Sequence, residues 1–82
     1  MADSEAVWLV EIRLNDWEPN LPGGTRIVSF EEVVACGEIA ARYAGFDQFA
    51  ARCNYEPVMR RKMLNWGLTQ HNCCAPDAVQ VS

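Results

Sequence analysis

The single histidine of the chain lies beside two residues that could assist it in catalysis. Cys74 lies three positions after His71, and Asp77 lies three positions after Cys74. Covalent catalysis combines a nucleophile, a base and an orienting group of these types. The segment has no glycine-rich element that would bind an oxyanion, and 82 residues leave little room for a substrate pocket. We therefore predict that the protein is not an enzyme.

The four cysteines are the second set of residues with possible chemistry. Together with His71 they would be numerous enough to bind zinc, but no Cys-x-x-Cys pair is present, and the adjacent Cys73 and Cys74 cannot easily reach one ion. We expect no metal and no other cofactor. Cys36 and Cys53 fall on predicted helices, where buried thiols are common. Cys73 and Cys74 fall in a predicted exposed loop and could form an intermolecular disulfide in air.

Charge points to a protein partner. Seven basic and eleven acidic residues give a net charge of −4, which argues against general binding to nucleic acid or anionic membranes. Nine of the acids lie within residues 1–47, and an acidic face there would be attracted to a basic protein surface. Trp17, between two acids in a loop with proline and glycine, is the expected aromatic anchor. The predicted partner-binding residues are Asp16, Trp17, Glu18, Glu31, Glu32 and Glu38.

Residues 46–66 support an alternative function, DNA binding. Two short predicted helices around residues 54–57 resemble a helix-turn-helix, and the second of them carries Arg60, Arg61 and Lys62. The turn lacks the usual glycine, and Arg60 stands where the motif needs a buried aliphatic residue. A helical hairpin with a solvated basic edge is therefore the favoured interpretation, and a helix-turn-helix regulator is the alternative.

A β-hairpin is predicted at the N-terminal end. Residues 6–14 alternate with a period of two and are rich in β-branched and aromatic side chains, which is typical of a strand. Residues 15–24 contain two prolines and two adjacent glycines, so they interrupt regular structure. Residues 25–28 then supply a second, antiparallel strand.

The longest predicted helix covers residues 30–44. Ser29 and Glu32 have the spacing of a capping box, in which each side chain bonds the backbone N–H of the other residue. Apolar and small residues then recur at steps of three and four. Gly45 is the expected end of this helix.

Two shorter helices are predicted to follow, over residues 47–53 and 57–66. Pro57 suits the first position of the last helix, because a backbone N–H is not needed there. From residue 67 onward the periodic signal fades, so an irregular C-terminal tail is expected, in which residues 78–81 either pair as a short edge strand or are disordered. The sequence thus predicts one α+β domain over residues 1–82, with the hairpin packed on three helices.

Size and composition add expectations about assembly and compartment. Half of the residues are apolar, which is generous for so small a chain, and we expect a homodimer. No apolar run reaches the roughly 18 residues of a membrane span. The first five residues are acidic where a signal peptide would be basic, so a cytoplasmic location is expected.

In its size, its acidity, its short strand- and helix-forming segments and its lack of a catalytic motif, the chain resembles small proteins encoded by phages, of which anti-CRISPR proteins are one group. These proteins share no common motif, so the resemblance assigns no functional residues. It implies binding to a CRISPR effector, whose basic nucleic-acid channels suit an acidic inhibitor that blocks DNA binding or cleavage.

Overall fold

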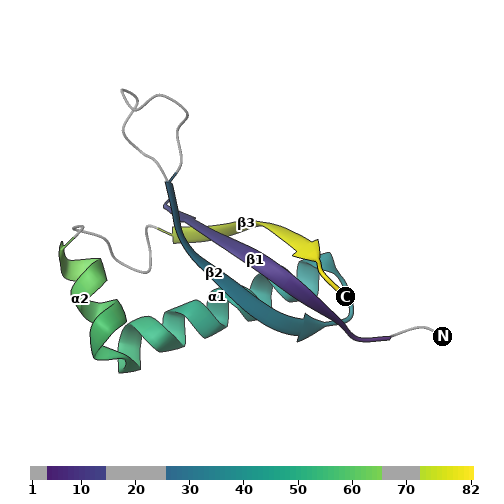
Figure 1. Cartoon of the computed structure of the whole chain (residues 1–82), viewed down its shortest axis with the longest axis horizontal. Helices are drawn as coiled ribbons and strands as arrows, with labels where there is room; N and C mark the ends of the chain where they lie inside the picture. Colours follow the sequence, from purple (N-terminus) through teal and green to yellow (C-terminus); the bar gives the residue numbers. More distant parts are fainter. Residues whose placement is uncertain (1–3, 15–25, 66–72) are drawn as a thin grey trace.

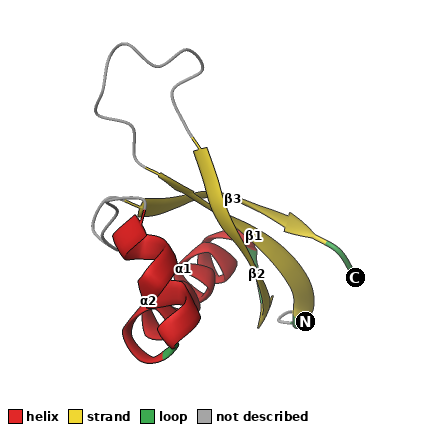
Figure 2. Cartoon of the chain, turned by 60° about the vertical axis from the view of Figure 1, so that its left-hand side comes forward, coloured by secondary structure: helices red, strands yellow, loops and turns green. Residues whose placement is uncertain are grey.

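The computed structural model describes residues 4–14, 26–65 and 73–82 (Figure 1). Its three strands form one antiparallel sheet in the order β2-β1-β3, and both helices lie on the same side of that sheet (Figure 2). The α+β class is as predicted, but the described residues form two helices where three were expected. In chain order the elements are β1 (Ala6–Leu14), β2 (Arg26–Ala35), α1 (Glu38–Tyr55), α2 (Pro57–Asn65) and β3 (Cys73–Gln80).

The hairpin is confirmed, but its second strand is longer than expected. β1 has the predicted bounds, and β2 continues to Ala35 where the sequence predicted a strand over residues 25–28 only. The two strands pair from Ala6 opposite Ala35 to Leu14 opposite Arg26. A bulge at Val28 interrupts the register, because Ile12 pairs with Ser29 whereas the next residue of β1 pairs with Ile27.

The helix predicted over residues 30–44 is wrong in its first part. Glu31, Val33 and Ala35 are buried, and the residues between them are exposed, so this segment alternates as a strand does. Its β-branched and aromatic side chains also favour a strand. Ser29 therefore lies within β2 and does not cap a helix.

α1 begins at Glu38 and continues without interruption through the stretch in which two helices were predicted. The backbone N–H of Ala41 bonds the carbonyl of Gly37 at 2.9 Å, which opens the helix. The predicted break at Gly45 does not occur, because the helix packs closely on the sheet at that residue. A Cβ atom on Gly45 would lie 2.6 Å from the Cβ atom of Val10, so only glycine permits this approach.

The C-terminal segment, expected to be irregular, contains β3. This strand pairs with β1 from Trp8 opposite Gln80 to Leu14 opposite Cys73. Ala75 and Pro76 together face the single residue Ile12, so a bulge accommodates the proline at the edge of the sheet. β1 is thus the central strand, and its backbone forms hydrogen bonds with an antiparallel neighbour on each side.

One hydrophobic core joins the sheet to the helices. Val10 and Ile12 of β1 have no exposed surface, and neither has Phe49 of α1. Met59 and Met63 bury one side of α2 against the same core, because residues four positions apart lie on the same face of a helix. The remaining core residues are Val33, Ala35, Ala41, Cys53, Cys73 and Ala78. Neither described helix is long and apolar enough to cross a membrane.

Candidate protein-binding site

The acidic residues predicted to bind a partner are not all at the surface. Glu31 is 1% exposed and must be removed from that set. Glu32 on β2 and Glu38 at the start of α1 are exposed, as expected. Glu31 was predicted at the surface because this segment was predicted to be a helix. In such a helix, Glu31 and Glu32 would both lie in the exposed first turn. The other three predicted residues, Asp16, Trp17 and Glu18, lie outside the described part of the chain.

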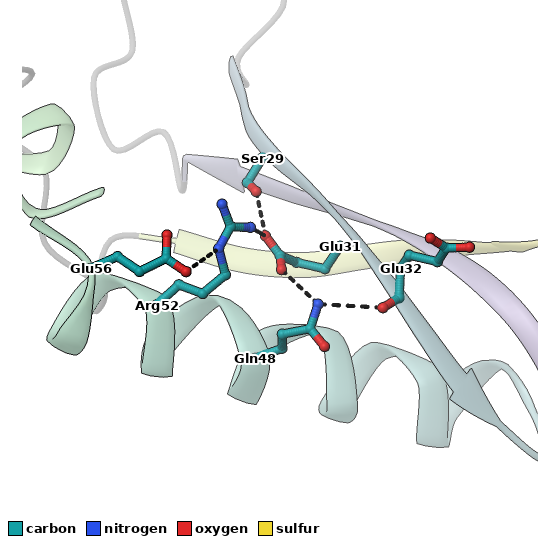
Figure 3. Close-up of polar contacts among 6 residues, drawn as sticks. All are labelled: Ser29, Glu31, Glu32, Gln48, Arg52 and Glu56. Atoms are coloured by element: carbon teal, nitrogen blue, oxygen red, sulfur yellow. Dashed lines mark hydrogen bonds and ion pairs between the residues drawn. The ribbon is translucent and has the colours of Figure 1, made fainter. Parts of the chain in front are cut away.

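Glu31 is the polar centre of the contact between β2 and α1 (Figure 3). Its Oε2 atom accepts a bond from the Ser29 hydroxyl and a 2.7 Å bond from Nη1 of Arg52, and its Oε1 atom accepts a 2.9 Å bond from Nε2 of Gln48. The hydrogen bond with Glu31 raises the pKa of Arg52 above its ordinary value. Nε of Arg52 also lies 3.4 Å from Oε1 of Glu56. The network fixes α1 on the sheet, and we assign it a structural role.

The opposite face of the sheet carries several exposed apolar side chains. Leu9, Phe30, Val34, Val79 and Val81 are 37% to 59% exposed, and no described element lies over them (Figure 2). The strand register brings them together: Val79 lies opposite Leu9, and Val34 lies opposite Val7, whose carbonyl accepts a 2.8 Å bond from the N–H of Val81. We call Val7, Leu9, Phe30, Val34, Val79 and Val81 the outer sheet patch.

Acidic side chains lie within this patch and beside it. Glu32 lies opposite Leu9 on β2, and Asp77 lies opposite Glu11 on β3; both are exposed. Glu11 itself pairs with Arg13 at 2.6 Å, so its charge is compensated within the same strand. Neither Glu32 nor Asp77 has an ion-pair partner among the described residues, so this surface suits a partner whose surface is apolar and basic.

The predicted basic residues lie on α2, but their surroundings differ from a helix-turn-helix. Arg60, Arg61 and Lys62 are all exposed, as the favoured interpretation expected. Only Glu56 separates α1 from α2, and α1 is a single helix of 18 residues, whereas the motif needs short helices joined by a turn of three or four residues. The described geometry therefore does not match that motif.

A pocket of about 490 Å³ lies between α1 and β3. Nε of Arg42 donates a 2.8 Å bond to the carbonyl oxygen of Ala75 and thus ties the two elements together. Cys74 lines this pocket, Asp77 lies further along β3, and His71 is outside the described residues. The pocket wall also includes Ile39, Tyr43, Phe46, Asp47 and Cys73. In the described part of the chain, no three of the His, Cys, Asp and Glu side chains are placed to bind one metal ion.

The positions of two cysteines differ from expectation. Cys36, predicted to be buried, is exposed after β2, whereas Cys73, predicted in an exposed loop, is buried on β3. Cys53 is buried as predicted, and Cys74 is half-buried. Burial, with smaller effects of Cys53 and Cys74, raises the pKa of the Cys73 thiol to about 11. The predicted pairing of Cys73 between chains would require this edge of the sheet to open.

We expect iodoacetamide at mildly alkaline pH to label Cys36 much faster than Cys73. The alkylating agent reacts with accessible thiolate, and Cys73 has neither the accessibility nor the low pKa that this needs. Cys53 should also react slowly, because burial raises the pKa of its thiol. Mass spectrometry of tryptic peptides at successive times measures the four rates. Equal rates for Cys36 and Cys73 in the folded protein would contradict the position of β3, and denaturant should equalise them.

Comparison with protein-family models, with curated proteins and with solved structures finds no match to this chain. The outer sheet patch and its acidic residues are therefore the features from which a function can be inferred.

Proposed function

We propose that this chain is a non-catalytic protein-binding inhibitor that docks through its outer sheet patch. The exposed apolar side chains on the uncovered face of the sheet are the observation that carries the proposal. Contiguous apolar surface of this kind marks interaction sites in small proteins, since leaving it in water is unfavourable. Glu32 within the patch and Asp77 beside it make a basic partner the best complement.

A CRISPR effector is the partner that we propose, as the resemblance to anti-CRISPR proteins implies. Effectors hold nucleic acid in strongly basic channels. An acidic protein of 82 residues docked at such a channel would block DNA binding or cleavage by its bulk. Such an inhibitor needs only apolar contacts and a few ion pairs with its partner. The outer sheet patch would make the apolar contacts, and Glu32 and Asp77 would make the ion pairs.

A second copy of the chain is the competing occupant of this face, in keeping with the predicted homodimer. Two copies packed face to face would bury apolar surface on both sides. They would also bring Glu32 and Asp77 of each copy close to the same acids of the other, which costs free energy. Charge therefore favours the basic partner over self-association.

We expect that the purified protein inhibits DNA cleavage by a purified CRISPR effector, and that Val34→Arg together with Val79→Arg abolishes the inhibition. Both valines are more than half exposed, so the fold should tolerate the change, whereas a basic partner would be repelled. Ile39→Arg is the matched control, because Ile39 is an exposed residue of α1, away from the patch. Cleavage assays over a panel of effectors are the measurement.

Each result of this experiment has a defined meaning. Full inhibition by the double variant would contradict the choice of surface, and failure to inhibit any effector would contradict the anti-CRISPR function. A dimer mass in light scattering that the double variant loses would assign the face to a second copy. Salt-sensitive binding to plain duplex DNA by the wild-type protein would instead support the DNA-binding alternative.

A further inference from the structure

The exposed side of α2 concentrates positive charge. Arg60, Arg61 and Lys62 are exposed on a helix of nine residues, and none of them has an ion-pair partner among the described residues. The nearest acid in the sequence, Glu56, shares the guanidinium of Arg52 with Glu31, so the four cations and two carboxylates of this region leave a net charge of +2. The three cations therefore follow one another within about 3 Å of helix rise, and at about 100° per residue their side chains spread over the whole exposed side of α2.

Val58 and Leu64 alternate with these cations around the exposed side of α2, and an aromatic side chain, that of Tyr55, precedes the helix. Tyr55 at the end of α1 is 83% exposed and Leu64 is 80% exposed, and Val58 is also largely in water. Exposed apolar side chains are unfavourable in water, so their presence among the charges indicates a binding surface and not merely a solvated basic edge. We call Tyr55, Val58, Arg60, Arg61, Lys62 and Leu64 the α2 surface.

The net charge of the whole chain does not cancel the field of this surface. The molecule is 45 Å long, and α2 lies at one end, whereas α1 begins at the other end, near the start of β1 and the end of β3 (Figure 1). Glu5 and Glu38 lie at that far end because they precede β1 and open α1. At physiological ionic strength, charges are screened over about 8 Å, so these acids have little effect on a ligand at α2.

We propose that the α2 surface binds single-stranded nucleic acid, with the three cations on phosphates and the Tyr55 ring stacked on a base. Cations that follow a phosphate backbone, combined with an exposed aromatic ring, are the features by which proteins bind single strands. A duplex keeps its base faces stacked inside, so Tyr55, Val58 and Leu64 would find no apolar partner there. The short α2 surface would cover only a few nucleotides, in agreement with a local contact.

This inference does not depend on the proposed function, because the isolated protein tests it. If both hold, the inhibitor would contact a basic protein surface with its outer sheet patch and a nucleic-acid strand with its opposite end. Failure of one leaves the other unaffected, since the two surfaces share no residue.

Fluorescence anisotropy with a labelled oligothymidylate measures the binding. We expect the logarithm of affinity to fall with the logarithm of salt concentration with a slope of about −2, from three phosphate contacts at roughly 0.7 each. Arg61→Gln should make that slope shallower by about 0.7. Tyr55→Ala should weaken binding roughly tenfold and leave the slope unchanged, because stacking releases no counterions.

Tyr43→Ala is the matched control, because Tyr43 is 71% exposed on α1 but is not part of the α2 surface, and it should bind as the wild type does. Circular dichroism checks that the exposed substitutions preserve the helices. Wild-type affinity of Tyr55→Ala, or equal affinity for a duplex, would overturn the proposal. Binding to vesicles containing phosphatidylserine without binding to the oligonucleotide would also overturn it, and would assign the α2 surface to lipid.

Discussion

Replacing Arg52 with methionine is expected to lower the free energy of unfolding by about 3 kcal/mol. The substitution removes the cation that pairs at 2.7 Å with Glu31, whose side chain has no exposed surface. A carboxylate left buried without its cation is costly, whereas methionine keeps most of the aliphatic packing. The effect stays at the lower end of the range for buried ion pairs, because Arg52 is 36% exposed and Ser29 and Gln48 still donate to the carboxylate. Urea denaturation followed by circular dichroism measures the change.

The double variant Arg52→Met with Glu31→Leu is the control for this prediction. Removing both charges leaves no buried carboxylate, and an apolar pair of similar volume often restores the stability of a buried ion pair. We expect recovery of more than half of the loss. A loss of less than about 1 kcal/mol for Arg52→Met alone would mean that water reaches Glu31 in solution.

Gly45→Ala is expected to destabilise the protein by about 2 kcal/mol, although the same change in an exposed helix stabilises by about 1 kcal/mol. The new Cβ atom would lie 2.6 Å from both Cβ and Cγ1 of Val10, so α1 must move away from β1. Overpacking of this kind costs about 3 kcal/mol, which exceeds the gain in helix propensity. Thermal unfolding of the variant and the wild type is the measurement.

Gly37→Ala separates this effect from glycine chemistry in general. A Cβ atom on Gly37 would meet nothing within 4 Å, and we expect a change of less than about 0.5 kcal/mol. Combining Gly45→Ala with Val10→Ala should cost less than the sum of the two single changes, because the clash then disappears. Additive effects would contradict the close approach of α1 to β1.

The sequence correctly predicts the elements whose spacing of apolar residues fits only a strand or only a helix. Residues 6–14 alternate over nine positions, and the strand occupies that range. The stripe of Met59 and Met63 is buried on α2, as helical spacing requires. Both elements could be predicted from their own residues, without knowledge of the elements that pack against them.

The segment from Ser29 to Gly45 was mistaken because its local signals conflict. Ser29 and Glu32 have the spacing of a helix cap, but residues 30–35 also alternate, and only pairing with β1 decides between the two. Gly45 is a common end for an isolated helix, yet here it permits contact with Val10. β3 is short, contains a proline and pairs with the opposite end of the chain, so its own residues give little sign of a strand.

The candidate site was predicted least well, since it depends on which side of the sheet is covered. Glu31 and Glu32 are adjacent and chemically identical, yet one lies beneath α1 and the other at the surface. Leu9, Val34 and Val79 had no functional prediction, because as isolated apolar residues in a sequence they indicate only core. Alternation along β1 places Leu9 on the second face of the strand together with Val7, and two apolar residues there predict that part of this face is also covered. That prediction is wrong for the described residues, because both helices lie on the other side of the sheet (Figure 2).

The position of β1 between β2 and β3 has a consequence for the route by which the chain folds. Pairing of β1 with β2 closes a short loop, whereas pairing with β3 joins residues near the two ends of the sequence and closes nearly the whole chain. Closing the longer loop costs conformational entropy before the contacts between β1 and β3 can stabilise the chain. Proteins with such long-range contacts fold more slowly than proteins whose contacts are local in sequence. We therefore expect the hairpin and α1 to form the folding nucleus and β3 to join last. Substitutions in β3 should accelerate unfolding and leave the refolding rate nearly unchanged.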